Sequence, residues 1–220
     1  MPADENGDGR QRPGGSHGTD RRGRRTNPAE TRARHALVED PNVVLEAALR
    51  FLEVRQRSVA EVRRRLTRAG YREDLVTGAI ARLGDLGILD DEAFALAWIE
   101  SRDRAHPRGE HALMLELRQK GLEAPTIAAA LRARREAAVR WEAETDDGED
   151  PEGAPHPSAD EAAARKLLAR HARALERIAD PRARRQRAYA LLARNGFGPG
   201  IAAEVSRELL AAADAEPTSD

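Results

Sequence analysis

Apolar residues recur at helical spacing through most of the chain. The first stripe has apolar residues at i, i+4, i+7 and i+8, namely Val44, Ala48, Phe51 and Leu52. This spacing predicts an amphipathic helix over residues 43–55. No run of alternating β-branched residues, which would be typical of a strand, occurs anywhere in the sequence. The pattern therefore predicts an all-α protein.

A helix, a glycine and a large apolar residue recur together three times. The glycines and the residues after them are Gly70-Tyr71, Gly121-Leu122 and Gly196-Phe197. Apolar pairs precede and follow each glycine: Val62, Leu66, Val76 and Ile80; Leu113, Leu117, Ile127 and Leu131; Ala188, Leu192, Ile201 and Val205. In the third stretch the following pair stands one residue nearer to the glycine. Glycine adopts the left-handed conformation at little cost, so each motif predicts a helix end followed by another helix.

Each motif follows a longer amphipathic segment, at residues 43–55, 91–104 and 159–178. We therefore predict an elongated tandem array of three three-helix repeats, with about nine helices. The predicted repeats are residues 42–90, 91–143 and 158–213, the third of them basic. Residues 1–41 and 214–220 are predicted to be disordered tails, and residues 144–157, rich in acidic residues and proline, an acidic linker.

Helix starts are marked by side chains that cap free backbone N–H groups. Ser58 with Glu61, and Ser158 with Glu161, have the Ser-x-x-Glu spacing of a capping box. The adjacent carboxylates Asp90 and Asp91 also stand where a helix begins, and we interpret them as capping residues and not as a catalytic pair.

Composition argues against several kinds of chemistry. The chain has no cysteine, which excludes disulfides, thiolate metal sites and thiol nucleophiles. Its six histidines do not form the i, i+4 pair of a helical zinc site. No nucleophile, base and orienting group can be assembled, so we predict that the protein is not an enzyme and has no catalytic, cofactor-binding or metal site. Without an apolar stretch of spanning length or a signal-peptide core, we expect a cytoplasmic protein that has no contact with membranes.

Charge is distributed unevenly along the chain. The whole sequence has 37 basic and 38 acidic residues. Residues 165–194, however, have two acidic residues, Glu176 and Asp180, and ten basic ones: Arg165, Lys166, Arg170, Arg173, Arg177, Arg182, Arg184, Arg185, Arg187 and Arg194. A module of this charge favours an acidic partner. The candidate partner-binding residues are Arg64, Arg68, Arg118, Lys120, Arg182, Arg187 and Arg194; for each helix taken alone, an ordinary solvated face is an equally good interpretation.

Three segments resemble the bacterial RecX family. They are residues 57–62 (RSVAEV) leading to Gly70-Tyr71, residues 89–95 (LDDEAFA) and residues 113–122 (LMLELRQKGL). The third module, with Arg187-Ala188-Tyr189 and Arg194 to Phe197, is similar to the last repeat of that family. The likeness extends over roughly residues 43–212; the long N-terminal tail and the acidic insertion after Trp141 depart from it.

The resemblance implies a regulator of RecA, the recombinase that polymerises on single-stranded DNA. Such a protein would bind the RecA filament and inhibit its recombinase and ATPase activities in DNA repair and the SOS response. We expect a monomer without a small-molecule substrate. The alternative is a non-specific nucleic-acid-binding helical module, whose basic third repeat would bind DNA weakly and in a salt-sensitive way.

Overall fold

The structure, a computed structural model, describes residues 27–145 and 158–215, with side chains for residues 27–139 and 158–208. These residues form ten α-helices and no strand, which confirms the all-α prediction. The helices are α1 (Pro28–Ala36), α2 (Pro41–Leu52), α3 (Val59–Ala69), α4 (Glu73–Asp85), α5 (Asp91–Ala105), α6 (Glu110–Lys120), α7 (Ala124–Thr145), α8 (Ala159–Glu176), α9 (Pro181–Arg194) and α10 (Pro199–Ala215).

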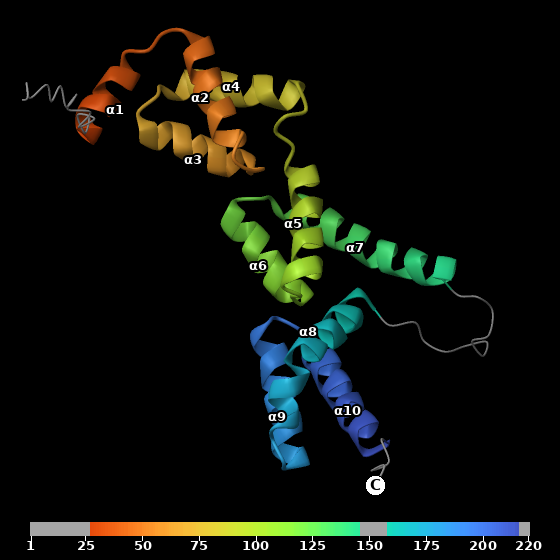
Figure 1. The fold of residues 1–220 in the computed structure, drawn as a ribbon. Coiled ribbons are helices and arrows are strands. Elements are labelled where there is room, and N and C mark those ends of the chain that lie inside the picture. The colour runs from red at the N-terminus through yellow and green to blue at the C-terminus, as the bar shows by residue number, and fades with distance from the viewer. Residues whose placement is uncertain (1–26, 146–157, 216–220) are drawn as a thin grey trace, which may run out of the picture.

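The helices group into three repeats, α2–α4, α5–α7 and α8–α10, each around a separate cluster of buried apolar residues. Figure 1 shows the repeats following one another along one direction, with α2–α4 at one end and α8–α10 at the other. This confirms the elongated tandem array. Helix α7 continues to Thr145 and α10 to Ala215. Residues 1–26 of the predicted N-terminal tail, 146–157 of the predicted linker and 216–220 of the predicted C-terminal tail lie outside the described residues.

The three glycines end α3, α6 and α9 as predicted. Gly70, Gly121 and Gly196 have φ angles of 98°, 90° and 82°. In each case the next backbone N–H donates to the carbonyl five residues earlier, from Tyr71 to Leu66, Leu122 to Leu117 and Phe197 to Leu192. This is the hydrogen bond of a Schellman motif. The predicted residues before each glycine are fully or almost fully buried: Val62, Leu66, Leu113, Leu117, Ala188 and Leu192.

The helix after each glycine keeps one register in all three repeats. Six residues after the glycine stand Val76, Ile127 and Ala202, and ten residues after it stand Ile80, Leu131 and Ser206, all buried. The sequence pattern put Ile201 and Val205 inward; Val205 is buried as predicted, but Ile201 is only partly buried. The pattern missed Ala202 and Ser206 because alanine is small and serine is polar, so neither residue type marks a core position.

Residues 28–36 were assigned to the N-terminal tail, but they form α1. The Asn27 side chain accepts from the Ala29 N–H and Pro28 occupies the first turn, so the helix start is well capped. The His35 ring stacks on Tyr71 with 4.3 Å between centroids. Helix α1 has no buried residue of its own. Its contact with repeat 1 depends on tertiary structure and leaves no apolar periodicity in the sequence.

Candidate functional site

The first two repeats join where the N-terminus of α3 lies on the glycine turn that ends α6. The Ser58 hydroxyl donates to the Lys120 carbonyl over 2.7 Å, and the Val59 N–H donates to the Asp91 carboxylate over 2.9 Å. A Cβ on Gly121 would come within 3.0 Å of Ala60. Position 121 therefore needs glycine for close approach as well as for its backbone conformation.

The second and third repeats join in the same way. The N-terminus of α6 lies on the turn after α9, where the Gly109 N–H donates to the Asn195 carbonyl over 3.0 Å. The Glu110 N–H donates to Asp160, also over 3.0 Å. A Cβ on Gly196 would come within 3.0 Å of Ala112. In both junctions the acceptor is the carbonyl just before the glycine, and a carboxylate of the next repeat receives the first N–H of the helix.

Helix α1 lies on the Gly70 turn as α3 and α6 lie on the later turns. His35 Nδ1 is 2.7 Å from the Ala69 carbonyl, again the residue before the glycine. A Cβ on Gly70 would come within 3.0 Å of the Arg32 backbone. Helix α1 thus occupies, at the first repeat, the position that a preceding repeat takes at the second and third.

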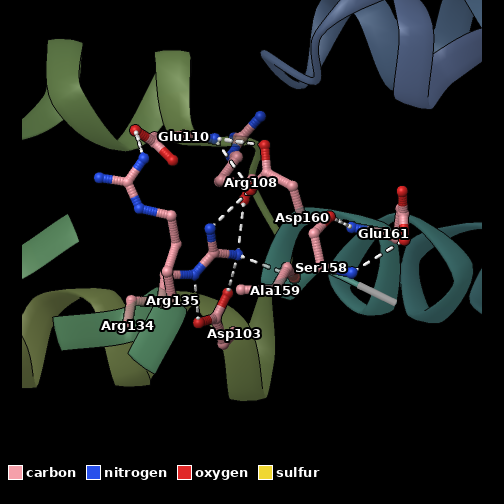
Figure 2. Close-up of polar contacts among 9 residues, drawn as sticks. All are labelled: Asp103, Arg108, Glu110, Arg134, Arg135, Ser158, Ala159, Asp160 and Glu161. Atoms are coloured by element: carbon pink, nitrogen blue, oxygen red, sulfur yellow. Dashed lines mark hydrogen bonds and ion pairs between the residues drawn. The ribbon is translucent and has the colours of Figure 1, made fainter. Parts of the chain in front are cut away.

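A buried arginine links repeats 2 and 3 through ion pairs. Arg134 of α7 lies between Asp103 of α5 and Asp160 of α8, as Figure 2 shows. Its Nε is 2.8 Å from Asp103 Oδ2 and its Nη1 is 2.5 Å from Asp160 Oδ1. The Arg134 side chain is 5% exposed. Burial alone would lower the pKa of Arg134, but the hydrogen bonds and charges of the two carboxylates outweigh burial and raise this pKa.

The carboxylates of Asp160 and Asp91, which accept hydrogen bonds at the two junctions, differ in whether a cation lies beside them. Asp160 has a buried guanidinium beside it, whereas Asp91 has none among its described partners. Burial raises the pKa of Asp91; the hydrogen bond from Val59 opposes this shift, and the charge of Asp90 adds to it. The Asp90 side chain caps α5 as predicted, accepting from the Glu92 and Ala93 N–H groups. Asp91, also predicted to cap, instead binds the preceding repeat.

Two of the predicted partner-binding residues meet at the first junction. Lys120 Nζ is 3.0 Å from Glu61 Oε1 and lies over the Trp98 ring at 4.6 Å from its centroid. Its side chain is 21% exposed, so its ammonium group is committed to holding the repeats together. Arg64 is exposed, and its Nη2 is 3.5 Å from the Lys120 carbonyl.

The other predicted residues are exposed but do not form one patch. Arg68 and Arg118 lie on α3 and α6, while Arg182, Arg187 and Arg194 lie on α9 in the last repeat. Even within α9 the three diverge. Arg187 and Arg194 are seven residues apart and share a face, but Arg182 lies about 140° around the helix from Arg187.

Part of the charge of the third repeat is used inside the protein. Lys166 and Arg170 of α8 donate to carbonyls of Asp103 and Ala105 at the end of α5. Arg165 pairs with Glu208 of α10 at 3.0 Å. The composition of residues 165–194 therefore overstates the charge that a partner can reach. Sequence reasoning missed these roles because no local spacing distinguishes a bridging cation from a solvated one.

Within residues 27–139 and 158–208, whose side chains the structure describes, no three His, Asp or Glu side chains come together as ligands for a metal ion. None of the described helices combines the length and apolarity needed to cross a bilayer.

Fold and junctions define a tandem array of three-helix units, a class of protein that presents extended surfaces. The first and second three-helix domains of RecX match residues 45–83 and 90–131 of this chain. A regulatory protein RecX from Thermobifida fusca is 32% identical over 168 residues, which cover 76% of this chain and 79% of that protein. The chain belongs to the RecX family of regulatory proteins, as its sequence motifs predicted.

Other relatives match over shorter stretches. The regulatory protein RecX of Mycolicibacterium smegmatis is 40% identical over 110 residues, covering 48% of this chain and 58% of that protein. The one from Mycobacterium sp. strain KMS is 42% identical over 83 residues, 45% of its length. The chain thus spans about half the length of these relatives. The crystal structure of RecX from Lactobacillus salivarius has the same fold, with a TM-score of 0.61 at 19% identity, covering 78% of this chain and 97% of that one.

Proposed function

We propose that this protein binds the RecA filament and inhibits its recombinase and ATPase activities, in the cytoplasm, as part of DNA repair and the SOS response. The observation that carries the proposal is the elongated array itself, in a member of a family of regulatory proteins. A string of repeats joined end to end offers a long surface, which suits a long, regular partner such as a filament.

Exposed arginines on one helix of each repeat supply the contacts in this proposal. Arg64 and Arg68 on α3 would contribute at one end of the array, Arg118 on α6 in the middle repeat, and the arginines of α9 at the other end. Such charges give specificity and a fast encounter with an acidic surface more than they give affinity. Lys120 does not belong to this surface, because Glu61 and Trp98 already hold its ammonium group.

The direct experiment adds the purified protein to RecA on single-stranded DNA and follows ATP hydrolysis and strand exchange. We expect both rates to fall as the protein concentration rises. A variant with Arg182, Arg187 and Arg194 replaced by Ala should inhibit less at the same concentration, while its unfolding free energy stays within about 0.5 kcal/mol of the parent. Rates that stay constant over a wide concentration range would exclude the proposal.

A matched control uses three other exposed arginines with the same total charge. Arg50, Arg104 and Arg132 each lie in an i, i+4 ion pair on a solvated face, with side chains 67–73% exposed. Replacing these three by Ala should leave inhibition unchanged. If both triple variants lose inhibition equally, net charge and not a docking surface explains the effect.

A second candidate function is non-specific nucleic-acid binding by the third repeat. The observation that favours it is α9, which has five arginines and no acidic residue over Pro181–Arg194. Binding of this kind weakens steeply with salt. Nanomolar binding to naked DNA that survives high salt would make this function the primary one.

A further inference from the structure

A hollow of about 500 Å³ lies between α9 and α10 in the last repeat. Helix α9 lines it with residues at i, i+3, i+4 and i+7, namely Arg182, Arg185, Gln186 and Tyr189. This spacing is a single stripe of a helix. Ser206 and Arg207 line it from α10. We call this feature the α9–α10 hollow.

A small residue lines the hollow at a position where the first two repeats have a large one. Ser206 occupies the position that is Ile80 in the first repeat and Leu131 in the second, ten residues after the glycine. Its hydroxyl donates to the Ala202 carbonyl over 2.6 Å within the same helix. The hydroxyl of this buried serine is therefore satisfied within α10, and its side chain is smaller than the branched apolar side chains of the first two repeats.

The position of Tyr189 also differs from its counterparts in the first two repeats. Seven residues before the glycine stand Arg63, Met114 and Tyr189. Arg63 hydrogen-bonds to Glu73 and to Thr77 of α4, which ties α3 to α4. Met114 packs against the core of the second repeat. Tyr189 is instead 37% exposed and forms a side of the open hollow.

The lining of the hollow is basic and has no carboxylate. Its guanidinium groups come from Arg182, Arg185 and Arg207, which are all exposed. Helix α9 has no acidic residue, and the acid next to Arg207 on α10, Glu208, points to Arg165 of α8. Three arginines thus line one hollow, whereas Arg187 and Arg194 lie on another face of α9.

These features fit a phosphate and a base together. Planar guanidinium groups bind phosphate oxygens in a bidentate way. An aromatic side chain beside a basic groove is the arrangement that holds the bases of single strands by stacking. The volume lies within the range of small-ligand sites. We propose that the α9–α10 hollow binds a nucleotide unit of single-stranded nucleic acid, with its arginines on backbone phosphates and Tyr189 stacked on a base.

This inference rests on the second candidate function above and adds to it the site and the form of the nucleic acid. In a duplex the bases are stacked on one another and are not free to cover Tyr189. An acidic peptide would use the arginines but would gain nothing from the exposed ring. A nucleotide unit of a single strand, which has both a phosphate and a free base, therefore accounts for more of the lining than either alternative.

The test measures fluorescence anisotropy of a labelled oligothymidylate as the full chain is added, without RecA. Arg182→Gln with Arg185→Gln should raise Kd about tenfold and reduce the slope of log K against log salt by about 1.4, since each phosphate contact on a single strand contributes about 0.7. Arg187→Gln with Arg194→Gln removes the same charge from another face of α9 and should change Kd by less than about threefold.

Two further variants test the shape of the hollow at constant charge. Ser206→Leu, which restores the residue type of the second repeat, and Tyr189→Ala should each raise Kd about tenfold. Circular dichroism and thermal unfolding establish that each variant is folded. If Ser206→Leu does not fold, Tyr189→Ala alone tests the shape of the hollow, because an exposed ring can be removed with little effect on folding.

Three results would overturn the inference. Equal weakening by the two arginine pairs would show diffuse attraction and leave nucleic-acid binding by the repeat intact. No binding of the oligonucleotide by the parent would remove the second candidate function as well. Displacement of the oligonucleotide by polyglutamate of equal length, with Tyr189→Ala unchanged, would assign the hollow to an acidic protein surface. Inhibition of RecA, measured separately, stands or falls independently of all three.

Discussion

The junction of repeats 2 and 3 should depend on Arg134 more than on any exposed charge near it. We expect Arg134→Met to weaken this junction strongly, because methionine fills part of the volume but removes the cation between Asp103 and Asp160. Asp160 is 9% exposed and, among the described residues, would keep the Glu110 N–H as its remaining partner. A buried carboxylate without a cation is strongly destabilising.

The expected loss follows from the burial of the three groups. Removing one partner of a fully buried ion pair costs roughly 3–5 kcal/mol. The Asp103 side chain is 34% exposed and regains water, so the lower end applies and we expect about 3 kcal/mol. The neighbouring Arg135 gives a matched control. Its pair with Glu110 has side chains 56% and 37% exposed, so Arg135→Met should cost less than about 1 kcal/mol.

Hydrogen exchange is the decisive measurement, because repeats in an array can open separately. In Arg134→Met the amides of α8 should exchange much faster, while those of α3 and α4 stay unchanged. Adding Asp160→Asn to Arg134→Met should recover much of the loss, since no uncompensated charge then remains buried. Equal losses in Arg134→Met and Arg135→Met, or an unchanged α8, would refute the reasoning.

Three further predictions concern the first junction and the core. Asp91→Asn should not destabilise the protein at neutral pH. Because burial raises the pKa of Asp91 in the folded protein, ionisation of this carboxylate costs stability as the pH rises through that pKa. The urea unfolding midpoints of parent and variant should therefore converge below the ordinary aspartate pKa of about 3.9. Gly121→Ala should lose more unfolding free energy than Gly87→Ala, because position 121 has φ of 90° and its new Cβ would clash with Ala60. At position 87 only the left-handed backbone costs about 1 kcal/mol, since no atom lies within 4 Å of the added Cβ. Equal losses of the two variants in chemical denaturation would argue against the close approach at Gly121. Leu66→Ala should cost about 2–5 kcal/mol, measured in the same way, because Leu66 is 1% exposed.

Local sequence was sufficient to predict the repeating fold. Apolar spacing, capping boxes and a glycine before an apolar residue act over a few neighbouring positions, so they can be recognised without coordinates. The structure confirms the capping boxes at Ser58 and Ser158. The same local reasoning placed Val205 correctly but put Ile201 inward and missed Ala202 and Ser206, because these two residues are buried without being large or apolar enough to mark a stripe.

The candidate sites depended on groups that are far apart in the chain. Arg134 occupies the buried stripe position that is Leu83 in the first repeat, thirteen residues after the glycine, and only the approach of Asp160 makes a cation stable there. Lys120, expected on a docking surface, binds Glu61 from 59 residues away. The sequence by itself determined which segments are helices and that they repeat, since those forces are local. Only the tertiary structure decided which charges hold the repeats together and which remain for a partner, because that division depends on where distant carboxylates and carbonyls lie.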